Sequence, residues 1–331
     1  MTGKPFLRLA LLGLICTLSA CTTAVRDTAV DTSLPRLHTP SDVLFWTPEQ
    51  REAGFRAMEA IVPHRNVAAG GRVHPLPQGE PLAIDPEPFM RAHQVAGLLV
   101  LQDGRIRLER YGLGFGPEGR WTSFSVAKSV TSTLVGTAIA DGHIEGLETP
   151  ITRYLPELTG SAYDGVSVRQ LLTMSSGADW NEDYEDPESD VAHFFGDRTI
   201  PEGTEPTLDY MRRLRRAAEP GTRWHYSTGE TSLVGVLIAR ATGQPLADYL
   251  SKKIWRPYGM ERDAAWMIDD NGQEPGGCCL VASLRDWGRG SSDGHFVEAK
   301  CITTILTLYN VLIVIQHISL VEYTMISICF P

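Results

Sequence analysis

The chain has 331 residues, which is enough for one large domain or two small ones. Its 43% hydrophobic and 21% charged residues are typical of a globular protein and exclude wholesale disorder. Because 30 basic residues stand against 40 acidic ones, the net charge is −10, which argues against a protein that binds the phosphate backbone of nucleic acids.

The first twenty residues have the pattern of a targeting segment. Two basic residues precede the apolar run 9–18, which is shorter than the roughly 20 residues needed to span a bilayer. The run leads through Leu-Ser-Ala to Cys21, an order that resembles a bacterial lipobox, in which the cysteine becomes the lipidated first residue. We therefore expect a lipoprotein signal peptide at 1–20, lipidation of Cys21, and a tether rich in Thr, Asp and Pro at 21–40.

This interpretation places the mature chain in the bacterial cell envelope, anchored by lipid and facing the periplasm. If the residue after the lipidated cysteine sorts lipoproteins between membranes, Thr22 at that position, rather than an Asp, favours the outer membrane. An ordinary secretory signal cleaved near Ala20 is the alternative.

The body begins with a predicted helix, a loop and a hairpin. Thr47 is a capping residue, Pro follows it at the first helical position, and Gln50 lies three residues after the cap, so a helix begins here. Residues 64–88 are rich in Pro and Gly and are predicted to form a loop. Residues 97–111 are two apolar runs that flank Asp103-Gly104, a strong hairpin signal because both central turn residues need positive φ.

Helices dominate the predictions after the hairpin. Apolar spacing and stop signals predict helices at 125–140, 229–241 and 245–255. Ser167 and Gln170 form a second capping box in front of a short apolar segment. Long helices beside a hairpin indicate an α+β fold.

Two charged clusters are interpreted as solvated surface. Thr207 is expected to cap a helix that carries the four arginines between 212 and 216. The acidic residues between 182 and 186 are expected to lie in a solvated loop, and contact with a cationic substrate is the alternative.

Residues 301–331 differ from the rest of the chain in composition. They contain seven Ile, against eleven in residues 1–300, and no Gly, Arg, Lys or Asp. We interpret 291–331 as an atypical hydrophobic tail of different coding origin, such as a frameshift, an insertion or a truncated reading frame. A transmembrane anchor is disfavoured because its longest clean apolar run, 311–315, is too short. A pair of genuine β-strands is the other alternative, since β-branched residues dominate.

Ser125-Val126-Ala127-Lys128 is the candidate catalytic sequence. Residues three apart lie on one face of a helix, so the Ser125 hydroxyl and the Lys128 amine are expected to be neighbours. A serine becomes a good nucleophile when a base takes its proton, and a buried lysine can be that base because desolvation lowers its pKa. Free N–H groups in the first helical turn could also hold a developing oxyanion. An exposed lysine on a solvated helix is the alternative.

Tyr226-Ser227-Thr228 is the second candidate element. A phenol near a lysine ammonium is expected to have a lowered pKa and could pass a proton to a leaving group. A core tyrosine at a helix start is the alternative. A Ser-His pair that uses His225 is disfavoured because no acidic residue stands at a recognisable spacing from it.

These residues resemble the serine β-lactamases and penicillin-recognising hydrolases. Ser125-Val126-Ala127-Lys128 is similar to the S-x-x-K nucleophile motif of that superfamily, and Leu171 to Gly177 is similar to the L-L-T-x-x-S-G signature of its class C-like branch. The Trp180-Asn181-Glu182-Asp183-Tyr184 segment looks closest to the 6-aminohexanoate-dimer hydrolases and related esterases. Further similar segments, in the same order, are Pro220 to Gly235, Pro257-Tyr258-Gly259-Met260, Gly276 to Cys279, and Arg285-Asp286-Trp287.

The resemblance implies an α+β domain over 41–290, with a helical part beside an antiparallel sheet. It implies Ser125 as the acyl-enzyme nucleophile, Lys128 as the proton acceptor and Tyr226 as the partner acid/base. The backbone N–H of Ser125 would be one oxyanion donor. The implied substrate is a small-molecule or peptide-like amide or ester, and no metal or organic cofactor is implied.

The sequence departs from the family at two places. Thr228 stands where the tyrosine motif of the β-lactamases carries Asn, which weakens a β-lactam substrate and leaves amide or ester hydrolysis more open. After Trp287 there is no K-T-G or H-x-G motif, which would line the pocket and bring the second oxyanion donor. Losing one such donor costs roughly 100- to 1,000-fold in turnover.

The missing motif predicts an impaired enzyme. The C-terminal sheet strands are expected to be truncated or replaced, which would expose the edge of the hairpin. We expect the chain to keep the first half of the site and to be inactive or barely active. An inactive remnant, or a non-catalytic lipoprotein that binds peptides or cell wall, is the alternative function.

The adjacent residues Cys278 and Cys279 are expected to be buried small residues. Adjacency strains a mutual disulfide, and it gives no spacing for metal ligands.

Overall fold

The computed structural model describes residue 43 and residues 46–196, 204–269 and 271–292, together with the backbone of 304–308 and 311–316. These residues all lie in one compact unit. The predicted signal peptide, the lipidation site Cys21 and the tether lie outside the described residues.

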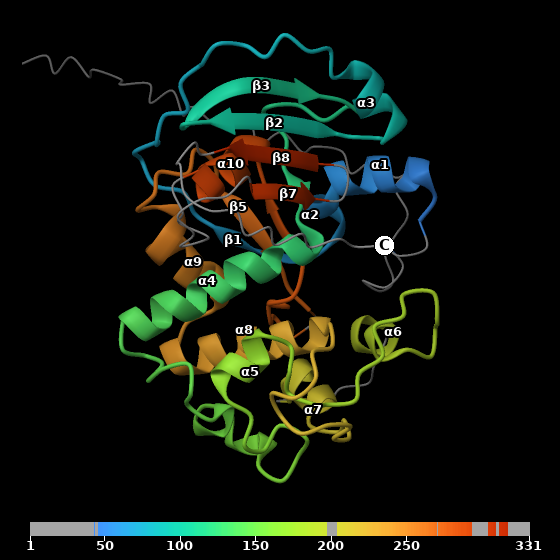
Figure 1. Cartoon of the computed structure of the whole chain (residues 1–331), viewed down its shortest axis with the longest axis vertical. Coiled ribbons are helices and arrows are strands. Elements are labelled where there is room, and N and C mark those ends of the chain that lie inside the picture. The colour runs from blue at the N-terminus through green and yellow to red at the C-terminus, as the bar shows by residue number, and fades with distance from the viewer. Residues whose placement is uncertain are drawn as a thin grey trace, which may run out of the picture. The chain divides into compact units, whose positions relative to one another are not determined.

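Two long helices, α4 (Ala127–Ala140) and α8 (Thr228–Thr242), pack against each other. In Figure 1, α5 and α7 lie near α8 toward one end of the view. The remaining helices are α1 (Pro48–Arg56), α2 (Met58–Ile61), α3 (Glu87–Ala92), α5 (Val168–Leu172), α6 (Asp190–Phe195), α7 (Pro206–Met211), α9 (Leu246–Leu250) and α10 (Leu284–Ser292). Single turns are the 3-10 segments η2 (Phe124–Val126), η3 (Ile151–Arg153) and η4 (Pro156–Leu158) and the π-helical η5 (Ser251–Trp255).

The described strands form two four-stranded sheets. Their orders are β1-β5-β6-β4 and β3-β2-β8-β7, and every pairing is antiparallel except β2 with β8. This combination of helices and mainly antiparallel sheet confirms the predicted α+β class. The strands are β1 (His64–Val67), β2 (Gly97–Gln102), β3 (Arg105–Tyr111), β4 (Trp121–Thr122), β5 (Ala264–Met267), β6 (Leu280–Ala282), β7 (Thr304–Leu308) and β8 (Val311–Gln316).

The predicted hairpin is confirmed. Strands β2 and β3 pair from Gly97 opposite Tyr111 to Gln102 opposite Arg105. The turn residues Asp103 and Gly104 have φ of 51° and 69°, the positive values that a two-residue turn of this kind needs.

The local helix signals are also confirmed. Thr47 and Ser167 each accept a hydrogen bond from the backbone N–H of the Gln three residues later, whose side chain accepts from the backbone of the cap. Helix α8 ends at Thr242 and is capped by Gly243, which has a φ of 68° and so adopts the left-handed conformation that glycine allows at a helix end.

Two predicted elements are wrong. Residues 64–67, placed in a loop by their Pro/Gly-rich surroundings, form strand β1 because β5 supplies a pairing partner far along the sequence. Thr207 is not a helix cap: α7 begins at Pro206 after Glu205 and ends at Met211, so the arginines lie at and beyond its end.

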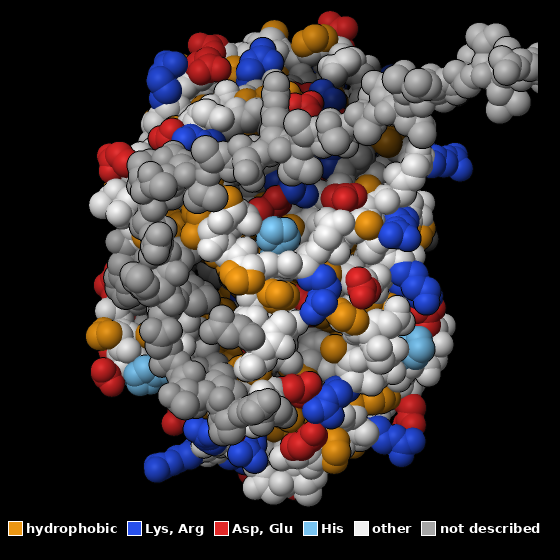
Figure 2. All heavy atoms as spheres, turned by 180° about the vertical axis from the view of Figure 1, so that it is seen from behind, with side chains coloured by type: hydrophobic (Ala, Val, Ile, Leu, Met, Phe, Trp, Pro, Cys, Tyr) orange, Lys and Arg blue, Asp and Glu red, His pale blue; other side chains and the backbone are white. Residues whose placement is uncertain are grey.

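The basic cluster behaves as solvated surface, as expected. Arg212 and Arg213 are exposed and pair with Asp209. Figure 2 shows acidic and basic side chains interspersed across one face of the molecule.

The C-terminal strands cover an edge that truncation was expected to expose. Strands β7 and β8 pair with each other, and β8 runs parallel to β2 from Gly97 opposite Val311 to Gln102 opposite Gln316. The backbone of these two segments therefore forms a pair of β-strands, the alternative given above for the tail. The different coding origin of the tail stays a prediction. No helix within the described ranges is long and apolar enough to cross a membrane.

Glu230 is an acidic side chain buried inside α8. It is 3% exposed, and the Ser176 hydroxyl donates a hydrogen bond to its Oε1. Its Oε2 has no hydrogen-bond partner among the described residues. Burial raises the pKa of Glu230 from its ordinary 4.5 to about 8, because desolvation penalises the charged form more than the Ser176 hydrogen bond favours it.

This burial predicts a pH-dependent stability. Because the folded-state pKa is raised, the stabilising effect of the neutral carboxyl is complete below about pH 4.5 and is lost as the pH rises through about 8. Between these two pH values the free energy of unfolding of the wild type should fall by up to about 1.4 kcal/mol for each pH unit, and we expect Glu230→Gln to remove this fall. Urea denaturation from pH 5 to 8 measures it, with the exposed Glu219→Gln as the control. Equal slopes in the two variants would contradict the prediction.

Candidate active site

Ser125 lies in the 3-10 turn η2 immediately before α4, and not in the first turn of the α-helix as predicted. Ser123, the residue just before this turn, fixes the turn to β6. Its N–H donates to the Leu280 carbonyl at 2.7 Å, and its hydroxyl accepts from the Leu280 N–H at 3.1 Å. Phe124 has a φ of 43°, a left-handed conformation that is unusual for a bulky residue. The strained backbone thus stands directly before the candidate nucleophile.

The ring of Phe124 compensates part of this strain by packing. It meets Phe55 of α1 edge to face at 5.1 Å between ring centroids. Phe55 is buried and also contacts Trp121 on β4. An aromatic cluster therefore holds the turn that carries Ser125.

Lys128 lies one turn further, with its amine directed at Ser125. Its Nζ is 3.0 Å from Ser125 Oγ, 3.0 Å from Thr228 Oγ1 and 2.8 Å from the Gly277 carbonyl oxygen. These three acceptors satisfy the three N–H donors of an ammonium group. The structure therefore brings the predicted serine and lysine into contact, and the alternative of a solvated lysine is wrong.

Burial of Lys128 destabilises its charged form. Desolvation by burial lowers its pKa from 10.5 to about 8, and the negative charge of Glu182 opposes part of that shift. An amine with this pKa can give up its proton near neutral pH and act as a base.

Tyr226 also reaches Ser125. Its hydroxyl donates to Ser125 Oγ at 3.1 Å, and the Lys128 amine lies 5.1 Å from the centre of its ring. The expected lowering of its pKa is wrong: burial raises the pKa of Tyr226, and the hydrogen bond to Ser125 offsets only part of that effect. The phenol is therefore protonated at neutral pH and can serve as an acid.

The loop 275–279 supplies the third acceptor of Lys128. It is fixed by the Trp266 indole N–H, which donates to the carbonyls of Pro275 and Cys278, and by the Thr131 hydroxyl, which donates to the Gly276 carbonyl at 2.7 Å. A Cβ on Gly277 would lie 2.8 Å from the Thr228 carbonyl oxygen. Glycine is required here because the loop packs directly on the start of α8.

Glu182 is a site residue that the sequence interpretation missed. Its carboxylate accepts hydrogen bonds from the Thr228 backbone N–H at 2.8 Å, from the Thr228 hydroxyl and from the Tyr184 hydroxyl. The acidic run from 182 to 186 was expected to be solvated, and this first member is not. The only signal in the sequence was the Trp-Asn-Glu-Asp-Tyr segment that carried the resemblance.

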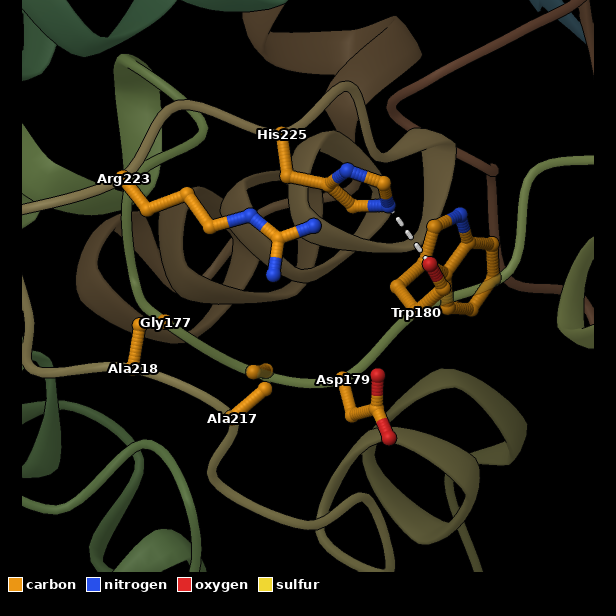
Figure 3. A pocket seen from close by; sticks show the side chains of 8 residues that line it. Gly177, Asp179, Trp180, Ala217, Ala218, Arg223 and His225 are labelled. Atoms are coloured by element: carbon orange, nitrogen blue, oxygen red, sulfur yellow. Dashed lines mark hydrogen bonds between the residues drawn. The ribbon is translucent and has the colours of Figure 1, made fainter.

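His225 lies apart from Ser125. Its Nε2 donates to the Trp180 carbonyl at 2.6 Å, and its ring lines a small surface pocket with Arg223, Asp179 and Ala217. Figure 3 shows the Arg223 side chain extending along this pocket beside the His225 ring. No hydrogen bond among the described residues joins His225 to Ser125.

The cysteine expectation is wrong. Cys278 and Cys279 are joined as a disulfide between neighbouring residues, and both are half-buried. Cys279 has a φ of 78°, so the backbone of the loop accommodates the adjacent pair by adopting a left-handed conformation there. Within the described ranges, no group of three or more His, Cys, Asp or Glu side chains is placed to hold a metal ion.

The packing of Gly277 generates a prediction. In Gly277→Ala the new methyl would clash with Thr228 and displace the carbonyl that accepts from Lys128, so we expect the reaction of Ser125 with a fluorophosphonate to slow by about 10- to 100-fold. Gly136→Ala is the control, because a Cβ there meets nothing within 4 Å and Gly136 lies on the same helix as Lys128. A reaction rate unchanged in Gly277→Ala would rule out this role for the loop.

Comparison with known proteins identifies the family of the chain. The Beta-lactamase family model matches residues 84–273, more than half of the chain. The 6-aminohexanoate-dimer hydrolase of Paenarthrobacter ureafaciens is 36% identical over 203 residues, which are 59% of this chain and 51% of that protein. A β-lactamase of Pseudomonas fluorescens is 29% identical over 184 residues, which are 53% of this chain and 47% of that protein. The chain thus spans about half the length of the curated relatives it matches.

A solved structure shares the fold. A Bacillus anthracis protein, provisionally assigned as a 6-aminohexanoate-dimer hydrolase, superposes with a TM-score of 0.66 at 20% identity, over 75% of this chain and 71% of that one. The predicted β-lactamase/transpeptidase-like fold is therefore confirmed. Because the family model matches more than half of the chain, in a range that includes Ser125, Lys128 and Tyr226, the chain belongs to the β-lactamase family.

Proposed function

We propose that the chain is a serine hydrolase that cleaves an amide or ester through an acyl intermediate on Ser125. The observation that carries the proposal is the position of Ser125 Oγ, 3.0 Å from the Lys128 amine and 3.1 Å from the Tyr226 hydroxyl. A base and an acid thus contact the same nucleophile.

The proposed acylation uses these contacts in order. The neutral Lys128 amine takes the hydroxyl proton as Ser125 Oγ attacks the carbonyl carbon of the substrate, which forms the tetrahedral intermediate. The Tyr226 phenol protonates the departing amine or alcohol, and Lys128 returns its proton to Tyr226. Water then attacks the acyl-serine with the same residues reversed, which releases the acid and restores the hydroxyl.

We further propose that turnover is impaired. The Ser125 backbone N–H is the expected first oxyanion donor, and no K-T-G or H-x-G motif follows Trp287 to bring a second. Electrostatic stabilisation of the oxyanion by each donor accounts for roughly 100- to 1,000-fold in rate. The proton-transfer groups are assembled, so acylation by a strongly activated reagent is the step that should survive.

The proposed substrates are non-β-lactam amides or esters. Thr228, in contact with Lys128, replaces the Asn expected in β-lactamases. Two relatives support this class by name: the 6-aminohexanoate-dimer hydrolase already described, and esterase EstB of Burkholderia gladioli, which is 31% identical over 155 residues, 43% of this chain and 37% of that protein.

The hydrolase proposal predicts selective labelling of one serine. A fluorophosphonate should label wild-type protein at Ser125, as located by peptide mass spectrometry, and Ser125→Ala should lose the label. Ser129→Ala, four residues along in the same segment, should keep it. We expect p-nitrophenyl acetate turnover roughly 100- to 1,000-fold below that of the Paenarthrobacter relative.

The possible outcomes separate the alternatives. A wild-type protein that is not labelled would support the non-catalytic remnant or binding lipoprotein. Turnover equal to that of the relative, and lost in Ser125→Ala, would contradict the impairment and leave the hydrolase proposal intact.

We also propose that Cys21 is lipidated and anchors the protein to the bacterial envelope, facing the periplasm. The support is the lipobox-like order of the sequence alone. Expressed in a bacterium, the wild type should incorporate labelled palmitate and remain with membranes after carbonate extraction, and Cys21→Ala should do neither. Incorporation into Cys21→Ala would contradict the proposal.

A further inference from the structure

The Thr228 hydroxyl stands between Lys128 and Glu182. Lys128 Nζ lies 3.0 Å from Thr228 Oγ1, and the same oxygen donates its hydrogen to Glu182 Oε1. A hydroxyl has one hydrogen, and an ionised carboxylate can only accept. The hydrogen of Thr228 is therefore committed to Glu182, and its lone pairs face Lys128.

This arrangement determines the direction of the lysine lone pair. A neutral amine has two N–H donors and one lone pair. The Gly277 carbonyl, at 2.8 Å, can only accept, and Thr228, oriented as above, also accepts. Both N–H groups of the amine are then used. The lone pair is left to face Ser125 Oγ, which lies 3.0 Å from the lysine nitrogen.

We propose that Glu182 is a positioning residue for Lys128: by holding the Thr228 hydroxyl as an acceptor, it directs the amine lone pair at Ser125. The inference rests on the proposed function, because it concerns the base that activates the same serine. Glu182 touches none of the reacting atoms and acts through Thr228.

The carboxylate is itself held in place. Glu182 Oε2 accepts from the Thr228 backbone N–H at 2.8 Å and from the Trp180 indole, and Oε1 accepts from the Tyr184 hydroxyl at 2.6 Å. The indole of Trp180 is fixed in turn, since its ring packs edge to face on Phe194. The carboxylate also lies at the start of α8, where negative charge is favoured.

The charge of Glu182 gives the role a signature. The carboxylate raises the pKa of Lys128 against the effect of burial. Removing the charge should therefore move the titration of Lys128 to lower pH, while freeing the Thr228 hydrogen should slow the reaction when the amine is fully neutral. A purely structural role would slow the reaction without moving the titration.

The test compares Glu182→Gln with the control Glu185→Gln, which removes an exposed charge from the same loop. The Glu185 side chain makes no hydrogen bond among the described residues. The first readout is the rate of fluorophosphonate labelling of Ser125 from pH 6 to 10. The second is the ¹³Cε shift of Lys128 over the same range, which reports titration without any reaction. We expect Glu182→Gln to lower the plateau rate by about 10- to 100-fold and to move both midpoints to lower pH, and Glu185→Gln to match the wild type.

A second variant guards against misfolding. In Glu182→Gln/Thr228→Asn, the Asn carbonyl can accept from Lys128 without a carboxylate to orient it, so part of the lost rate should return. Two results would overturn the inference. One is that the titration midpoints of Glu182→Gln equal those of the wild type. The other is that adding Thr228→Asn to Glu182→Gln restores none of the lost rate. A wild type that does not label but whose Lys128 midpoint responds to Glu182→Gln would contradict the hydrolase proposal and retain the coupling of Glu182 to the lysine.

Discussion

The site depends on one constraint: a half-buried lysine amine needs an acceptor for each of its hydrogens. Taking the ammonium out of water lowers the pKa of Lys128 to about 8, and an unpartnered donor there would cost further free energy. The acceptors come from three separate segments: Ser125 before α4, Thr228 at the start of α8, and Gly277 in the loop before β6. The site therefore exists only when the two long helices and one sheet have come together.

The rest of the fold holds these segments at the required distances. Strand β6 is hydrogen-bonded to Ser123, so the turn that carries Ser125 and the loop that carries Gly277 are fixed to the same strand. The absence of a side chain at Gly277 lets that loop approach α8 closely. The strands β7 and β8 lie in the other sheet, where β8 covers the edge of β2. Strand β7 also contacts the turn η2, which carries Ser125, so this second sheet lies against the site as well.

Several locally unfavourable features gather around this site. Phe124 adopts a left-handed backbone conformation directly before Ser125, and Glu230 is buried on α8 two residues after Thr228. Such features persist only when surrounding packing compensates for them. The aromatic contact between Phe124 and Phe55 and the Ser176 hydrogen bond to Glu230 provide part of that compensation. The candidate site is therefore surrounded by residues whose own conformation or burial depends on the packing of the fold.

The sequence by itself determined the features that depend on local chemistry. The hairpin turn at Asp103, the capping box at Thr47 and the adjacency of Ser125 and Lys128 each follow from residue types a few positions apart, because turns, caps and helix faces are short-range structures. Only the tertiary structure decided the pKa direction of Tyr226, the carboxylate of Glu182 beside Thr228, and the strand β1. Each of these depends on desolvation or on a partner far along the chain, and the spacing of residues in the sequence predicts neither.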